Sequence, residues 1–403
     1  MKTNILTLLI LLLLISCQNN PPANQESNII DLSGLWDSED VVRLSEVAES
    51  IEYIALETKE ACMIPDAGNV RARIDGNRIF VIPYESDIKV FDISGQYLFD
   101  LGSYGQGPGE YKYVKVLTDC TAEIVWILDT AQKKLIKYRF DGTFLHESKV
   151  GPFVCRIVLL DNSQLVALNL PPREQAEEAS IQYLDQNGII TKEVPLYDGF
   201  KPGAGAIWAI ALSLGVVDDE LHFIEPPFRE VVGFNGKNEW TKLWSINQGK
   251  ETASDEDYFD LNSGLWTTTY IGQIWETNQF FFIGGMHERT SRYFVYDKTS
   301  GKIRASRVLA ETTNTRDMYG LMNDLDGGLP SWPMGSAGEN KYLEIHNAQR
   351  FIDLAHGEIT YYYEKQTTPV TEKLRDLCKK LDPEDNPVVV VVRLKAKSKN
   401  RDK

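Results

Sequence analysis

The sequence predicts an all-β protein: a six-bladed β-propeller whose N- and C-terminal strands close one blade, with short helical insertions near the C-terminus. The main evidence is a hairpin that recurs along the chain as an apolar strand, a polar turn with glycine and a second strand. Successive turn glycines lie about 47 residues apart, with one longer step, which is typical of propeller blades of four strands each. These glycines are Gly95, Gly142, Gly188, Gly236 and Gly301.

The chain begins with the pattern of a secretory signal. Residues 1–4 carry one Lys, and residues 5–15 are almost wholly apolar. About 11 apolar residues are too few to cross a bilayer core, which needs roughly 20, so the segment is a signal peptide and not a membrane span. We therefore assign residues 1–16 to a signal peptide that is removed on export.

Residues 14–17 (LISC) resemble the bacterial lipobox. That resemblance implies that the thiol of Cys17 receives diacylglycerol and that Cys17 becomes the new N-terminus, so the protein is held on a membrane by its lipid. The alternative is an ordinary signal peptide with a cysteine there by chance. No Asp directly follows Cys17, which favours the outer membrane; whether the protein faces the periplasm or the cell exterior stays open.

The next residues read as a tether. Residues 18–27 (QNNPPANQES) are polar, contain two prolines and lack large apolar side chains, a composition that cannot form a core. We assign residues 17–44 to the lipidated cysteine and a flexible tether, residues 45–396 to the propeller and residues 397–403 to a polar tail.

Within the propeller, residues 90–98 and 137–145 are the clearest copies of the recurring hairpin. Each copy follows another short run of β-branched and aromatic residues, as expected for a preceding strand. These runs are residues 78–82, 124–128, 164–168, 221–224 and 280–283. Five hairpins imply at least five blades.

The two ends supply a sixth blade. Residues 50–56 form an early strand without a repeat partner before it, and residues 386–394 form a β-branched strand near the C-terminus. Joining them in one blade closes the ring and removes two exposed edges. Helices are expected at residues 371–381 and 347–356, and the longer step between turn glycines predicts an inserted loop at residues 248–267.

Composition excludes some partners. The formal net charge is −16, and loss of Lys2 with the signal makes the mature chain more acidic. Nucleic acid and anionic lipid surfaces demand clustered Lys and Arg, so no nucleic-acid partner is expected. Four cysteines remain after Cys17, with either disulfides or free thiols open and no zinc-type spacing among them. They are Cys62, Cys120, Cys155 and Cys378.

Several segments resemble landmarks of a family of bacterial six-bladed β-propeller lipoproteins, distant relatives of the NHL-repeat propellers. The segments are residues 50–58 (SIEYIALET), 102–111 (GSYGQGPGEY), 323–328 (NDLDGG), 386–388 (NPV) and 394–395 (LK). The resemblance covers roughly residues 45–395. It implies an exported propeller and assigns no reaction.

Two glycine-rich segments are candidate ligand sites. Residues 105–111 are interpreted as a tight turn and not a phosphate loop, because no Lys-Ser/Thr and no helix follows. Asn323, Asp324 and Asp326 half-resemble a calcium loop but lack a later bidentate carboxylate, so a rigid Asx-type turn and a metal or ligand site are both retained. Trp332 is added as a candidate surface for stacking on sugars, against the alternative of packing between blades.

Other polar residues carry weaker signals. The five histidines form no short metal motif, and His222 within a strand reads as structural. Glu57, Arg71, Asp75 and Asp129 lie near strand ends, where propeller channels are lined, and are named by position alone. No catalytic residue is assigned, because the chain has no Gly-x-Ser-x-Gly elbow and no evident nucleophile–base pair.

We expect a lipid-anchored envelope propeller that binds a ligand or protein, with an oligosaccharide or another envelope protein as its partner. The alternative is an enzyme, either a metal-assisted hydrolase or a polysaccharide lyase. A purely structural envelope scaffold is a third class. No cofactor is predicted, and a divalent cation such as calcium stays open as a ligand.

Overall fold

The computed structural model describes most of the chain from residue 28 onward. The described residues are 28–65, 69–160, 163–172, 178–198, 200, 213–218, 220–236, 239–250, 252–254, 257–258, 268–306, 320–338, 340–357 and 368–396. The signal peptide, Cys17 and the polar tail lie outside them. So does most of the expected insertion at residues 248–267.

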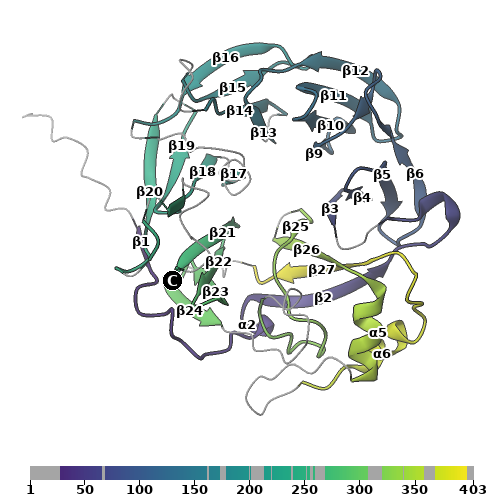
Figure 1. The fold of residues 1–403 in the computed structure, drawn as a ribbon, viewed down its shortest axis with the longest axis vertical. Coiled ribbons are helices and arrows are strands. Elements are labelled where there is room, and N and C mark those ends of the chain that lie inside the picture. Colours follow the sequence, from purple (N-terminus) through teal and green to yellow (C-terminus); the bar gives the residue numbers. More distant parts are fainter. Residues whose placement is uncertain are drawn as a thin grey trace, which may run out of the picture.

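The described strands include six blades of four antiparallel strands each, arranged in a ring around a central axis (Figure 1), which confirms the six-bladed propeller. Blade 1 comprises β3 (Val70–Asp75), β4 (Arg78–Pro83), β5 (Ile88–Asp92) and β6 (Tyr97–Leu101). Blade 2 comprises β9 (Val114–Asp119), β10 (Ile124–Asp129), β11 (Lys134–Arg139) and β12 (Phe144–Lys149). Blade 3 comprises β13 (Val154–Leu159), β14 (Leu165–Asn169), β15 (Ser180–Leu184) and β16 (Ile190–Pro195).

Blade 4 comprises β17 (Ser213–Val217), β18 (Glu220–Ile224), β19 (Glu230–Phe234) and β20 (Trp240–Asn247). Blade 5 comprises β21 (Tyr270–Glu276), β22 (Phe280–His287), β23 (Thr290–Asp297) and β24 (Lys302–Ser306). The first strand of each of blades 1 to 5 is innermost, and the inner strands of blades 2 and 3, 3 and 4, and 4 and 5 contact each other.

Blade 6 joins the two ends of the propeller, as the sequence predicted. Its strand order is β2 (Ala48–Ala55), β27 (Val388–Leu394), β26 (Lys341–His346) and β25 (Gly335–Ser336). Tyr53 pairs with Val390 across β2 and β27, so the ring is closed by hydrogen bonds between segments at opposite ends of the chain. Because of this pairing, the ring has no gap between its first and last blades.

The core lies between adjacent blades, where strand residues alternate between the two faces of each sheet. Between blades 1 and 2, for example, Phe80, Val90, Val125 and Ile136 are fully buried against one another. The β-branched and aromatic runs recognised in the sequence supply these faces. Their burial is the main stabilising contribution of each blade-to-blade contact.

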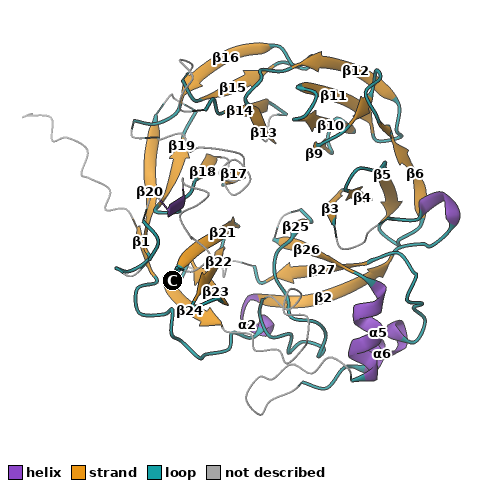
Figure 2. Ribbon diagram, viewed as in Figure 1, coloured by secondary structure: helices purple, strands orange, loops and turns teal. Residues whose placement is uncertain are grey.

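Short elements decorate the ring (Figure 2). Both predicted C-terminal helices are present, as α5 (Ala348–His356) and α6 (Glu372–Cys378). The remaining elements are α2 (Leu44–Val47), the 3₁₀ turn η1 (Glu60–Cys62), and the short parallel strands β7 (Ser103–Tyr104) and β8 (Glu110–Tyr111).

Residues 28–44 differ from the predicted flexible tether. β1 (Asn28–Asp31) pairs in parallel with β20 as a fifth strand of blade 4. Trp36 is then buried against blades 4 and 5, and its indole N–H donates to the carbonyl of Gln248, which follows β20, at 2.8 Å. Apolar residues between positions 29 and 44 gain this burial on the outside of the ring, so the N-terminal segment is a strap across blades 4 to 6.

Candidate functional site

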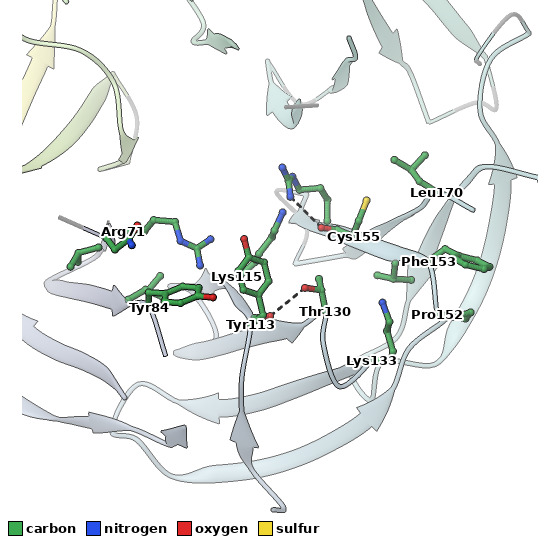
Figure 3. A pocket seen from close by; sticks show the side chains of 15 residues that line it. Arg71, Tyr84, Tyr113, Lys115, Thr130, Lys133, Pro152, Phe153, Cys155 and Leu170 are labelled. Atoms are coloured by element: carbon green, nitrogen blue, oxygen red, sulfur yellow. Dashed lines mark hydrogen bonds between the residues drawn. The ribbon is translucent and has the colours of Figure 1, made fainter. Parts of the chain in front are cut away.

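A cavity of about 900 Å³ opens at one end of the central channel, between blades 1, 2 and 3 (Figure 3). Its wall is made by the first residues of the three inner strands and by the turns that follow the second strands. We call it the basic pocket. It is lined by Asn69, Val70, Arg71, Ile82, Tyr84, Tyr113, Lys115, Thr130, Lys133, Pro152, Phe153, Val154, Cys155, Arg156 and Leu170.

Three of its cations occupy the same place in successive blades. Arg71 pairs with Ile82, the last residue but one of β4. Lys115 pairs with Leu128, the last residue but one of β10. On β13 a bulge at Cys155 shifts the register, and Arg156 then pairs with Leu168, the last residue but one of β14. The propeller repeat therefore brings three basic side chains to one level of the channel.

The basic pocket contrasts with the acidic protein that contains it. Lys133, on the turn between β10 and β11, adds a fourth cation, and no Asp or Glu is among its described lining residues. The chain as a whole carries a net charge of −16. Cations gathered in a concave site raise the local concentration of anions there. The structure thus confines a positive region to one end of the channel.

The guanidinium of Arg71 is held in place by neighbouring groups of blade 2. Its Nη2 donates to the Val114 carbonyl oxygen at 2.8 Å, and its Cζ lies 5.8 Å from the centre of the Tyr113 ring. The side chain keeps contact with solvent, yet the channel walls lower the pKa of Arg71 by removing water from its charge. A guanidinium fixed in this way has donors left for a ligand.

Arg156 lies close enough to Arg71 for their charges to repel. Burial, followed by the charge of Arg71, lowers the pKa of Arg156 to about 10. The same residue interacts electrostatically with Tyr113, so all three side chains face one region. An anion bound there would offset the repulsion between the two arginines, because a negative charge favours the charged form of both guanidinium groups.

Two tyrosines flank the cations. Tyr84 follows β4 and is 56% exposed, and Tyr113 precedes β9 and is 43% exposed. Figure 3 shows Tyr84 beside Arg71, and Tyr113 beside Lys115. A tyrosine ring offers an apolar face with a hydroxyl at its tip, so it can pack on a flat ligand while its oxygen forms a hydrogen bond.

Asp129 supports this end of blade 2 without facing a ligand. It is fully buried, and its carboxylate accepts hydrogen bonds from the backbone N–H groups of Lys112, Ala131 and Gln132 at 2.7 to 3.0 Å. These bonds fix the turn that carries Lys133 and the segment that carries Tyr113. Asp129 is therefore a positioning residue of the basic pocket.

The other positions named from strand ends do not reach the pocket. Glu57 accepts from the backbone N–H of Tyr97 at 2.9 Å, at the junction of blades 6 and 1. Asp75 lies at the far end of β3, where it accepts from Arg73 and Thr118. Of the four positional candidates, only Arg71 lines the basic pocket.

The loop with Asn323, Asp324 and Asp326 lies beside blade 6, apart from the basic pocket. Asn323 Oδ1 accepts from the backbone N–H groups of Leu325 and Asp326, which makes an Asx turn. Asp326 Oδ1 accepts from Asn323 Nδ2 at 2.8 Å and from the Tyr53 hydroxyl at 3.1 Å. Asp324 accepts from the Ser45 backbone N–H at 2.8 Å. Protein donors thus occupy these oxygens, and a ligand at this loop remains a prediction.

Trp332 requires a correction. Its indole is only 4% exposed, and its ring packs edge-on against Phe282 and Tyr293 with centroid separations of 5.7 and 4.6 Å. It therefore fills the core between blades 5 and 6 and has no open face for a sugar. The alternative considered for this residue, packing between blades, describes its position.

The segment at residues 105–111 is a turn tied down by side chains. The backbone N–H of Gly107 donates to Glu110 at 2.6 Å, and that of Gly109 donates to Glu147 at 2.9 Å. Lys134 donates to the Gly107 carbonyl at 3.1 Å. Because carboxylates occupy these N–H groups, the loop offers no anion cradle of the kind that binds phosphate.

Histidines and cysteines form no cluster in the part of the chain that the structure describes. His222 pairs with Glu276 at 2.9 Å, and His346 pairs with Glu344 at 2.8 Å. No group of three or more His, Cys, Asp or Glu among the described residues could hold a metal ion. The four cysteines after Cys17 are free thiols.

Sequence reasoning missed Lys115, Arg156 and the two tyrosines. A signal was present: Val70–Arg71 and Val114–Lys115 place a cation directly after the valine that begins an inner strand, and Val154 precedes Arg156 by two residues. Recognising it requires knowing which strand of each blade is innermost. The bulge at Cys155 further displaces the third copy from the repeat.

Comparison with known proteins identifies the family. The family model described as "Domain of unknown function (DUF4934)" matches residues 27–393. The chain belongs to this DUF4934 family. No curated protein matches it.

A search of solved structures found proteins with a similar backbone. A Bacteroides fragilis protein described as a predicted exported protein is 18% identical, with a TM-score of 0.70 over 92% of this chain and 100% of that chain. A Bacteroides vulgatus member of the DUF4221 family is 10% identical, with a TM-score of 0.49 over 89% of this chain and 99% of that chain. The first likeness shows a shared propeller fold at low identity.

Proposed function

We propose that this DUF4934 propeller is an envelope binding module that recognises an acidic oligosaccharide at the basic pocket. The observation that carries the proposal is the gathering of Arg71, Lys115, Lys133 and Arg156 around one cavity whose described lining contains no carboxylate. In a chain with a net charge of −16, such a region is hard to attribute to solubility. Charges that repel one another are retained where they bind an opposite charge.

The pocket fits a sugar better than a small inorganic ion. About 900 Å³ lies within the range of cavities that hold organic ligands, roughly 300 to 1,000 Å³. Guanidinium groups recognise carboxylate and sulfate groups through paired hydrogen bonds. Exposed Tyr84 and Tyr113 add flat surfaces for the apolar face of a pyranose ring. Together they match a ligand that is both ring-shaped and anionic.

The test is calorimetric titration of the mature chain with oligogalacturonates of defined length. Their methyl esters are the matched control, because esterification keeps the shape and removes the charge. We expect binding of the acid and at least about tenfold weaker binding of the ester, since hydrogen bonds to charged groups are the stronger kind. Equal binding of acid and ester, or binding of neither across a panel of acidic sugars, would contradict the proposal.

An enzyme acting on the same ligand is the second candidate. The specific observation is the phenol of Tyr113 beside the guanidinium of Arg71, 5.8 Å from ring centre to Cζ. A cation that neutralises a uronate carboxylate next to a group able to transfer a proton is what β-elimination requires. The test is ultraviolet absorbance of the unsaturated sugar after incubation with polyuronates. Binding without any such product assigns the pocket to recognition.

The anchoring of the module is part of the proposal. A lipid on Cys17 would hold the propeller at the outer membrane through the residues that precede the strap. Among the described residues, no helix has the length and apolar character needed to span a bilayer. A lipid anchor requires no such helix, because acyl chains alone supply the membrane affinity.

A further inference from the structure

The two arginines of the basic pocket come from blades that are not adjacent. Arg71 is on β3 of blade 1 and Arg156 is on β13 of blade 3, while β9 of blade 2 lies between them. All three strands place their cation at the same level, as their registers show. Both arginines line the same cavity, so side chains from blades 1 and 3 border a common space.

Tyr113 marks that common space. The Arg71 guanidinium lies over its ring, and its phenol interacts electrostatically with Arg156 as well. Arg71 is also fixed by the Val114 carbonyl, and one nitrogen of Arg156 lies 3.4 Å from the carbonyl oxygen of Cys155. Both guanidinium groups are therefore oriented by backbone before any ligand arrives, which lowers the entropic cost of binding.

We infer that Arg71 and Arg156 form a clamp that holds one acid group of the ligand end-on in the channel, with Tyr113 beside it. This inference rests on the proposed function and sharpens it. The recognised unit is a single acidic sugar residue, terminal or pendant, and the rest of the oligosaccharide extends out of the cavity past Tyr84. A chain lying flat across blades 1 to 3 with one charge per cation is the arrangement that the clamp excludes.

Convergence favours the clamp over the flat arrangement. If each cation bound a separate charge of a polyanion, the cations would be best placed far apart. Repulsion between close cations would lower the stability of the ligand-free protein and would add no contact with such a ligand. Here Arg71 of blade 1 and Arg156 of blade 3 line one cavity, together with Tyr113, and the Arg71 guanidinium lies over the Tyr113 ring. One carboxylate, sulfate or phosphate group between them can accept paired hydrogen bonds from both forks.

The experiment compares ligands that carry one charge with ligands that carry several. The methyl glycoside of galacturonic acid is titrated beside its methyl ester, glucose 6-sulfate, glucose 6-phosphate and an oligogalacturonate. We expect the monoacid to bind within about tenfold of the oligomer and the ester to bind far more weakly. The sulfate and phosphate arms identify which acid group the clamp prefers.

A double-mutant cycle gives the second readout. Arg71→Gln and Arg156→Gln should each weaken binding of the monoacid about tenfold or more, and the double variant should lose little beyond either single one, because both arginines act on one group. Lys302→Gln, on exposed β24 of blade 5, is the matched control and should bind as the wild type does. Thermal unfolding of each variant verifies that it is folded.

The outcomes separate the two claims. Binding of the oligomer without binding of any monoacid, together with additive losses in the cycle, overturns the clamp and leaves acidic-oligosaccharide recognition standing. Binding of no acidic ligand at all overturns both. Binding of the monoacid with strong coupling between the two arginines supports both.

Discussion

At the residue scale, Arg156 links the proposed binding role to stability. Burial and the nearby charge of Arg71 both disfavour its charged form in the free protein. The folded state therefore carries a cost at neutral pH that the unfolded chain does not. Residues that bind ligands commonly carry a cost of this kind.

We predict that Arg156→Met leaves the melting temperature unchanged or raises it, while binding of acidic sugars weakens about tenfold or more. The methionine keeps an apolar stem and removes the repelled charge. Arg73→Met is the matched control. Arg73 is also an arginine on an inner strand, β3, but it is paired with Asp75, so its replacement should lower stability. Thermal unfolding with and without ligand measures both effects. A large fall in stability for Arg156→Met would show that its role is structural.

Binding should weaken as the pH rises through about 10. The pKa of Arg156 is lowered to about 10 in the free protein, so above that pH the guanidinium loses the charge that an acid group requires. As the pH rises through this range the folded state becomes more stable relative to the unfolded state, because the arginine of the unfolded chain still holds its proton there. Titrations from pH 7 to 11 measure the first effect. The difference in binding free energy between the wild type and Arg156→Gln separates the titration of Arg156 from that of the two lysines. A difference that does not change with pH would contradict the assignment.

Glu225 carries a second residue-scale prediction. It follows β18, its Oε1 accepts from the Tyr197 hydroxyl, and its Oε2 is buried without a partner among the described residues. Burial raises the pKa of Glu225 to about 8. Because this pKa is raised in the folded state, the free energy of unfolding decreases as the pH rises from about 4.3, the pKa of an unfolded glutamate, to about 8. In that range the carboxyl group is ionised in the unfolded chain but not in the folded one.

Glu225→Gln should therefore stabilise the protein at pH 8, and the gain should shrink toward pH 5. The amide keeps an oxygen for Tyr197 and cannot ionise. Melting temperatures of both proteins across that pH range are the measurement. A gain that does not depend on pH would place the ionisation elsewhere.

At the scale of elements, sequence reasoning succeeded where local chemistry decides. The five turn glycines all have positive φ, from 68° at Gly301 to 87° at Gly142. At Gly95 a Cβ would also stand 2.2 Å from the Ala55 carbonyl oxygen, so only glycine fits there. The hairpins were predictable for this reason. The closing blade and both C-terminal helices were predictable from the local spacing of apolar residues in the corresponding segments.

Segments that carry no repeat or periodic pattern of their own, and whose role depends on distant partners, were not predictable. The strap at residues 28–44 was assigned to the tether because it follows the polar residues 18–27 and its apolar residues match neither the propeller repeat nor a regular period, and only the surfaces of blades 4 to 6 explain them. The basic pocket is similar: Arg71 was named from its position, but its neighbours come from two other blades. The loop with Asn323, Asp324 and Asp326 fails in the opposite way. The sequence reveals its oxygen atoms as possible ligands, but it does not reveal the protein donors that already bond to them.

The strap should contribute to stability and not to binding. Trp36 packs edge-on against Phe294 at 4.9 Å between centroids, and Arg292 donates to its carbonyl at 2.7 Å. Trp36→Ala should cost about 3 to 5 kcal/mol, as for other large aromatic residues truncated in a core. Ile29→Ala, at an exposed position of β1, is the matched control with little effect. Denaturant unfolding measures the loss, and unchanged sugar affinity at low temperature is expected.

At the scale of the whole molecule, charge is distributed unevenly. The chain carries a net charge of −16, whereas the described lining of the basic pocket has four cations and no carboxylate, so we expect the cavity to attract small acidic ligands while the protein as a whole repels large polyanions. This arrangement suits a module that captures the acidic end of a glycan near a membrane. It also explains why overall acidity excluded nucleic acid without excluding an anionic ligand.

Replacement of the anchor cysteine tests the proposed location. Cys17→Ala should release the propeller from the membrane fraction and leave its melting temperature unchanged, because the described fold begins at residue 28. Cell fractionation with detection of the protein in each fraction is the measurement. Continued association with membranes would contradict the lipid anchor and direct attention to protein contacts.

The most direct test of acidic-sugar recognition is a crystal structure of the propeller with an oligogalacturonate. The account predicts electron density in the basic pocket, with one carboxylate within hydrogen-bonding distance of both Arg71 and Arg156 and a sugar ring against Tyr113 or Tyr84. Density for the sugar at another surface, with the basic pocket free of it, would contradict the assignment of function to this end of the channel.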